Sequence, residues 1–221
     1  FTAAAFTEVA IEADRRGLQI AVHAIGDGAV RMVLDGYQAA ARANGLRGIR
    51  HRIEHIELIH PDDIDRFAAL GVIASMQPPH APGMAGLPLE PTVSRIGEAR
   101  WRHAYAWQTL RQTGARMVFG TDWPVSPIDP LLAIECAVTR PVWRDGLPPQ
   151  AQSLGDTLRS YTHDSAFAER MEYRKGMLRA GMLADLVVLD GDIETRPPAT
   201  IHEMAVRTTI CDGRVVHSAD G

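Results

Sequence analysis

Residues 116–122 read RMVFGTD, a short apolar run of the β type that ends in the carboxylate of Asp122. Three runs of similar length precede it along the chain, namely residues 18–23 (LQIAVH), 49–55 (IRHRIEH) and 72–77 (VIASMQ). Short runs rich in apolar residues are typical of strands that are covered on both faces. We therefore expect four strands at these positions.

Amphipathic segments of the helical type lie beside these runs. They cover residues 1–16, 29–44, 61–70, 102–113 and 129–139. The third of them opens with a proline, which is favoured at helix starts. Strands that alternate with helices at this spacing predict repeated βα units on one parallel sheet, and therefore the α/β fold class.

The pattern changes after about residue 148. Residues 154–161 and 165–170 indicate short helices, whereas residues 184–189 (ADLVVL) and 205–216 (AVRTTICDGRVV) indicate strands. An Asp-Gly pair splits the last run and predicts a hairpin turn. We expect two domains, an α/β part in residues 1–170 and a small β-sandwich appendage in residues 171–221.

The composition excludes several classes of function. The 221 residues carry a formal charge of −4, with 46% apolar and 23% charged residues, so neither nucleic acid nor an anionic membrane is an expected partner. The sequence has no run of 18 or more apolar residues, the length that would predict a membrane-spanning helix. The two cysteines, Cys136 and Cys211, form no disulfide pattern and are expected to be small buried side chains in a cytoplasmic protein.

Polar residues stand where the predicted strands end. His23 ends the first, His55 the second, and Asp122 the fourth. Because the carboxyl ends of parallel strands in an α/β barrel face a common mouth, we expect these three side chains to converge. Two imidazoles and a carboxylate suit zinc or a similar divalent ion. Taken singly, either histidine could instead be a hydrogen-bonded core residue, and Asp122 could cap its loop.

The third strand ends in Gln77, and His80 follows after two prolines. Residues 78–91 are rich in Pro, Gly and Met, and loops at this end of a barrel commonly shape a binding site. We expect Gln77, His80 and Trp123 to contact the substrate in a partly apolar pocket. His51 shares a strand face with His55, which places it deeper inside the barrel or gives it a structural role.

Four motifs carry a family resemblance: HAIGD (residues 23–27), IEH (53–55), SMQPPH (75–80) and GTDWPV (120–125). In this order they resemble the second half of amidohydrolase family 3, within the amidohydrolase superfamily, over nearly the whole chain. The resemblance implies βα units 5–8 of a metal-dependent-hydrolase TIM-type (β/α)8 barrel, with trailing helices, followed by strands of a small β-sandwich.

The resemblance also implies roles for the matching residues. His23 and His55 are similar to the pair that binds the more exposed metal. Asp122 resembles the metal-bound carboxylate that takes a proton from the nucleophilic water. The implied cofactor is one or two divalent ions, most simply zinc, in the complete enzyme.

The chain departs from the family pattern in one respect. It contains no His-x-His pair, and its only lysine is Lys175, near the C-terminus. We therefore expect that the first four strands of the barrel are missing and that the N-terminal half of the barrel is the partner. Without that half, a piece with two open sheet edges is expected to be inactive.

The sequence thus predicts a metal-dependent hydrolase that acts on a C–N, amide-like bond of a small molecule. A deaminase of the same superfamily would use the same residues, and a non-catalytic binding or regulatory domain is the alternative from another class. A homo-oligomer is left open, as is the identity of the substrate.

Overall fold

The computed structural model describes residues 2–219, so Phe1 and the last two residues of the predicted appendage lie outside it. Its centre is a four-stranded parallel sheet whose strands follow one another in sequence order. The strands are β1 (Ala21–Ala24), β2 (Arg52–His55), β3 (Ile73–Met76) and β4 (Met117–Phe119). The predicted parallel α/β arrangement is confirmed.

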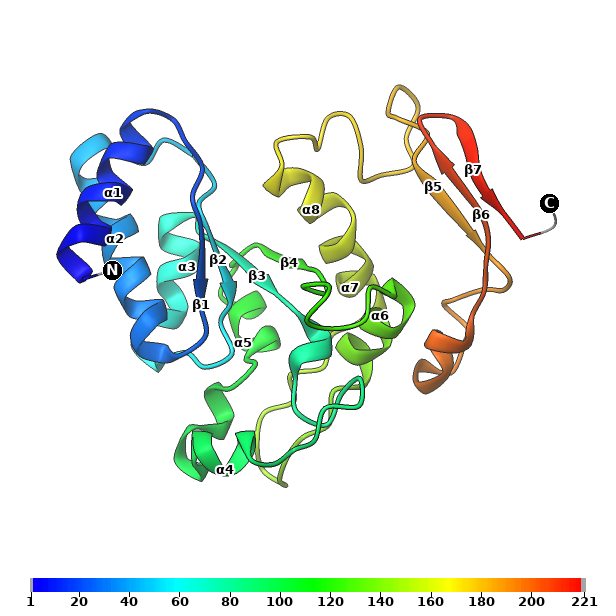
Figure 1. The fold of residues 1–221 in the computed structure, drawn as a ribbon, viewed down its shortest axis with the longest axis horizontal. Helices are drawn as coiled ribbons and strands as arrows, with labels where there is room; N and C mark the ends of the chain where they lie inside the picture. The colour runs from blue at the N-terminus through cyan, green and yellow to red at the C-terminus, as the bar shows by residue number, and fades with distance from the viewer. Residues whose placement is uncertain (1, 220–221) are drawn as a thin grey trace.

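Helices connect the strands, and α1, α2 and α3 lie together on one side of the sheet (Figure 1). The α-helices are α1 (Ala3–Arg15), α2 (Asp27–Asn44), α3 (Ile64–Leu70), α4 (Thr92–Ile96), α5 (Trp107–Gln112), α6 (Pro130–Thr139), α7 (Leu154–Tyr161) and α8 (His163–Ala168). Short 3-10 helices are η1 (Pro61–Asp63), η2 (Pro78–His80), η3 (Glu98–His103) and η4 (Pro198–Glu203). None of the helices in the described part of the chain is long and apolar enough to cross a membrane.

Local signals explain where several helices begin. The Thr2 hydroxyl accepts a hydrogen bond from Ala5 N at the start of α1. The Asp129 carboxylate does the same for Leu131 N at the start of α6, where Pro130 occupies the first turn. Such caps satisfy backbone donors that have no partner inside the helix.

Apolar side chains between the sheet and its helices form the main core. Those that are almost fully buried include Val30, Leu34, Ile53, Phe67, Met76, Trp107 and Met117. Burial of a side chain of this size stabilises the fold by about 1.5–3 kcal/mol. The core therefore fixes the sheet on which the predicted site residues lie.

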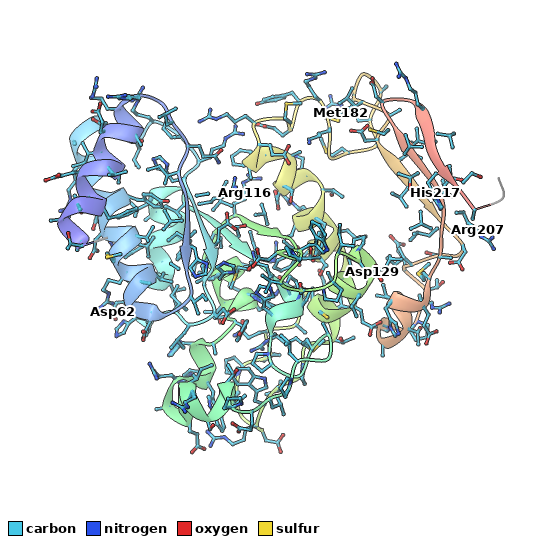
Figure 2. All side chains as sticks on the ribbon, in the orientation of Figure 1. Asp62, Arg116, Asp129, Met182, Arg207 and His217 are labelled. Carbon is cyan, nitrogen blue, oxygen red and sulfur yellow. The ribbon has the colours of Figure 1, made fainter. Side chains whose placement is uncertain are left out.

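A second set of contacts ties α8 to the amino ends of the strands. The ring of Phe167 lies between two guanidinium groups, with Arg50 Cζ at 3.6 Å and Arg116 Cζ at 3.7 Å from the ring centroid. Arg50 also makes an ion pair with Glu172 at 2.6 Å, and Arg116 one with Asp164 at 2.6 Å. Figure 2 shows Arg116 beside α8.

The C-terminal residues form a three-stranded antiparallel sheet of β5 (Leu186–Leu189), β6 (Val206–Cys211) and β7 (Arg214–Ser218). It stands apart from the parallel sheet (Figure 1). The predicted Asp-Gly turn joins β6 to β7. Within residues 171–219, this is the one sheet that the structure describes. The β-sandwich and the domain boundary at residue 170 therefore stay predictions.

Three local predictions need correction. Strand β4 ends at Phe119, so Asp122 lies in the loop beyond it. The helix expected over residues 102–113 begins only at Trp107, because η3 ends at His103 and Ala104 forms a β-bridge with Leu58. Cys136 is buried as expected, but Cys211 is exposed, because it ends a strand of the outer sheet.

Candidate metal centre

The parallel sheet brings the predicted site residues to one edge. His23 is the third residue of β1, and His55 is the last residue of β2. Gln77 directly follows β3, and Asp122 lies three residues beyond the end of β4. The carboxyl ends of all four strands therefore supply a polar side chain to the same region.

The backbone at the end of β2 adopts an uncommon conformation. His55 has a φ of 77° and Ile56 a φ of 52°, both in the left-handed region. This region is strained for a β-branched residue such as Ile56. The turn is held because Ile56 N donates to Ala24 O at 3.1 Å and the Ile56 side chain is fully buried. This turn fixes the direction in which His55 and the residues after it leave β2.

His55 is oriented by its neighbours. Gln77 Oε1 lies 2.9 Å from His55 Nδ1, so the ring donates through Nδ1–H and keeps a lone pair on Nε2. A histidine held in this way is prepared to bind a metal through its other nitrogen. The ring of His23 meets the ring of His55 edge to face, with centroids 4.4 Å apart. The predicted histidine pair is thus brought together.

His80 is a second neighbour of His55. The two rings stack with centroids 5.8 Å apart and an angle of 13° between their planes. His80 Nε2 lies 3.9 Å from Asp122 Oδ2 and is buried, with no hydrogen-bond partner among the described residues. A buried nitrogen without a partner indicates a ligand that the polypeptide itself does not supply.

Glu57 completes the arrangement, and the sequence analysis missed it. Its Oε1 lies 3.6 Å from His80 Nδ1, and one ligand atom each from His55, Glu57 and His80 lie within 4.8 Å of one another. Burial and the nearby Glu57 carboxylate raise the pKa of the Tyr105 phenol. The sequence did contain a signal for Glu57. In residues 55–57 (HIE), a carboxylate stands two residues after a histidine that ends a strand.

Asp122 and Trp123 lie in the loop that follows β4, and both are exposed. Asp122 also has a left-handed backbone, with a φ of 57°, and its carbonyl accepts a hydrogen bond from Val125 N at 2.8 Å. Ser126 Oγ donates to the Thr121 carbonyl and closes the same turn. The Trp123 side chain is 63% exposed. It is available to a substrate, and its contact with one stays a prediction.

His51 has a structural role, one of the two expectations for it. Its Nε2 lies 3.1 Å from Asp14 Oδ1, and its Nδ1 accepts a hydrogen bond from Ile20 N at 3.2 Å. The ring stacks on Tyr37 with centroids 4.8 Å apart. A cavity of about 520 Å³ lies beside His51 and Phe167 at the amino ends of the strands, away from the candidate metal centre.

Comparison with known proteins places this geometry in a family. The model described as "Amidohydrolase family" matches residues 1–217. Protein LONG AFTER FAR-RED 3 of Arabidopsis thaliana is 39% identical over 80% of the chain and 30% of its own length. N-substituted formamide deformylase of Arthrobacter pascens is 26% identical over 97% of the chain and 39% of its own length.

A solved structure agrees with the sequence relatives. An uncharacterized metal-dependent hydrolase from Pyrococcus horikoshii OT3 superposes with a TM-score of 0.70 at 28% identity, covering 98% of the chain and 40% of the solved one. The chain thus spans 30% to 40% of the length of these relatives. From its motifs, its sheet and these matches, the chain belongs to amidohydrolase family 3.

Proposed function

We propose that this chain carries the metal-binding strand ends of a hydrolase that cleaves a C–N, amide-like bond with metal-activated water. One observation supports this most directly. His23 and His55 face each other at the carboxyl edge of the sheet, and Gln77 holds the second of them by Nδ1. This arrangement leaves the Nε2 lone pair of His55 available for a ligand.

Ligand atoms of His55, Glu57 and His80 lie within 4.8 Å of one another, which supports a divalent ion at this edge of the sheet. His23, His55 and Asp122 would hold it, and imidazole and carboxylate ligands together favour zinc. The buried, unpartnered Nε2 of His80 supports a ligand at this place. A bound divalent ion supplies Lewis acidity, which lowers the pKa of water and polarises a carbonyl group.

The chain's own residues divide the remaining work. The Asp122 carboxylate accepts a proton from water and returns it to the leaving nitrogen. His80, which faces Asp122 at 3.9 Å, contacts the substrate near the reacting atoms. Gln77 positions His55, and Trp123 offers an apolar surface to the rest of the substrate.

We infer the class of substrate from the name of one relative. The Arthrobacter pascens protein is an N-substituted formamide deformylase, and its name describes cleavage beside an amide nitrogen. We infer a small-molecule amide for this chain as well, in a cytoplasmic protein whose cysteines are free. The longer relatives support the further proposal that another part of the protein completes an eight-stranded barrel.

The test uses the full-length protein with His23→Ala and His55→Ala combined. We expect the double variant to lose bound zinc, measured by mass spectrometry of metals, and to lose hydrolysis of N-substituted formamides. His217→Ala is the matched control, because His217 lies on β7 in the outer sheet (Figure 2). A double variant that keeps its metal and its full activity would refute the proposal.

A further inference from the structure

Glu57 lies two residues beyond the end of β2, and distant segments of the chain fix its backbone. Tyr105 N donates to the Glu57 carbonyl at 2.8 Å, and the next residue, Leu58, forms a β-bridge with Ala104. Leu58 N also donates to the Ile25 carbonyl at 3.0 Å. The backbone of Glu57 is therefore tied both to the loop after β1 and to the segment before α5.

The side chain of Tyr105 holds the Glu57 carboxylate. Burial raises the pKa of the Tyr105 phenol, as do the negative charge of Glu57 and a hydrogen bond between the two side chains. The phenol therefore keeps its proton and donates to the carboxylate. Tyr105 is 3% exposed, and its ring packs edge to face against Trp143 with centroids 6.2 Å apart. Because Tyr105 is itself fixed by packing, it holds Glu57 in one position.

The backbone of His80 is also fixed, but its ring has two possible orientations. His80 N donates to the Gln77 carbonyl at 3.0 Å, and Pro78 and Pro79 before it are buried. Stacking on His55 restricts the plane of the His80 ring. A half-turn about the Cβ–Cγ bond would keep that plane and put carbon atoms where the two nitrogens lie. A polar neighbour is therefore needed to select one orientation.

Glu57 is such a neighbour. Its Oε1 lies 3.6 Å from His80 Nδ1, and His80 Nε2 lies 3.9 Å from Asp122 Oδ2. The side chains of His80 and Glu57 are only 10% and 21% exposed, so water screens their interaction weakly. A carboxylate can only accept hydrogen bonds, and it therefore favours the ring orientation that turns an N–H toward it.

We propose that Glu57 is a positioning residue for the hydrolysis: its carboxylate, held by Tyr105, keeps the His80 ring with Nδ1–H toward Glu57 and Nε2 toward Asp122. This inference rests on the proposed function, in which His80 contacts the substrate near the reacting atoms. Glu57 itself touches neither the metal nor the substrate and acts through His80. A misplaced His80 ring slows the reaction, because catalysis depends on the alignment of groups around the reacting atoms.

The kinetic test uses Glu57→Leu in the full-length protein. Its kcat for an N-substituted formamide should fall by about 10–100-fold, whereas KM should stay within a few-fold and bound zinc should not change. Glu57→Gln should recover most of the rate, because its amide oxygen still accepts from Nδ1–H. Loss of zinc in Glu57→Leu would make Glu57 a metal ligand and overturn the proposal, and so would an unchanged kcat.

Glu135→Leu is the matched control. Glu135 belongs to another pair of a glutamate and a histidine, with its Oε2 2.6 Å from His202 Nδ1, and this pair joins α6 to η4. The control should keep the wild-type kcat and zinc content.

A double variant shows whether Glu57 acts through His80. In a protein that already carries His80→Ala, Glu57→Leu should cause no further loss in kcat, because the two residues act as one unit. Losses that multiply would mean that Glu57 acts independently of His80, which refutes the positioning role.

Nuclear magnetic resonance of the metal-free, ¹⁵N-labelled full-length protein tests the ring without an assay of hydrolysis. The His80 signals are identified by their absence from His80→Ala. Nδ1 should carry the proton in the wild type and in Glu135→Leu, whereas in Glu57→Leu the two ring nitrogens should share it. The same Nδ1–H form in Glu57→Leu would overturn the proposal even in an active enzyme. The expected spectra from a wild type that hydrolyses no amide would refute only the proposed function.

Discussion

Gln77 has one acceptor oxygen directed at His55, and this contact decides which ring nitrogen is free. We predict that Gln77→Leu weakens zinc binding by about 10–100-fold, as loss of a residue that orients a metal ligand typically does. Competition with a chromophoric chelator measures the affinity. The variant should keep its fold, because leucine is similar in size to glutamine.

Gln77→Glu is the control for this prediction. It keeps an acceptor oxygen opposite His55 Nδ1, so its zinc affinity should stay within a few-fold of the wild-type value. An unchanged affinity in Gln77→Leu would show that His55 is not held by Gln77 or does not bind the metal.

Asp122 allows a substitution that separates chemistry from folding. Its backbone is left-handed, with a φ of 57°, and asparagine tolerates that region better than most residues. Asp122→Asn should therefore fold normally but lose about 10²–10⁴-fold in kcat, since the amide cannot accept the proton. Steady-state kinetics and circular dichroism check the two parts. Activity close to wild type would exclude Asp122 as the base.

At the scale of elements, His51 links α1 to the sheet through Asp14. Burial lowers the pKa of His51, although the hydrogen bond to Asp14 opposes this effect. In the unfolded chain a histidine takes up a proton near pH 6.5, whereas the folded His51 does so only at lower pH. The neutral His51 ring therefore contributes to the stability of the folded state above about pH 6.5. This contribution is lost as the pH falls below that value.

We predict that the free energy of unfolding decreases between pH 7.5 and 5.5, and that His51→Gln removes part of this decrease. Urea titrations at the two pH values measure it. His217→Gln is the control, because the exposed His217 should leave the pH dependence unchanged. The His51 account is wrong if both variants show the same dependence as the wild type.

The elements were more predictable than the contacts between them. Four short runs and their helices indicated the parallel sheet, and the sheet alone brings His23 and His55 together. Glu57 was not predicted, because its position depends on the left-handed backbone at His55 and Ile56. Neither of these residue types predicts a left-handed backbone from sequence. Asp122 was expected at a strand end, but the strand stops earlier at Phe119, where the Trp123-containing loop begins.

At the scale of the whole molecule, β1 and β4 are the two edges of the parallel sheet. In the relatives, the matched region is less than half of the protein. We predict that residues 1–221 expressed alone bind zinc more weakly than the full-length protein and do not hydrolyse amides, because on the proposed function the remaining ligands come from outside these residues. Metal analysis and an amide hydrolysis assay test both statements. Hydrolysis by the 221-residue chain would contradict them.

The stack of Phe167 between Arg50 and Arg116 lies at the amino ends of the strands, while the residues proposed to bind metal lie at the carboxyl ends. In directed evolution this separation is useful. A library confined to residues 85–91 and 123–125, none of them buried, varies loops beside the proposed site without changing His80, Asp122 or the contacts that fasten α8 to the sheet. New specificities can therefore be selected there from a population of variants most of which still fold.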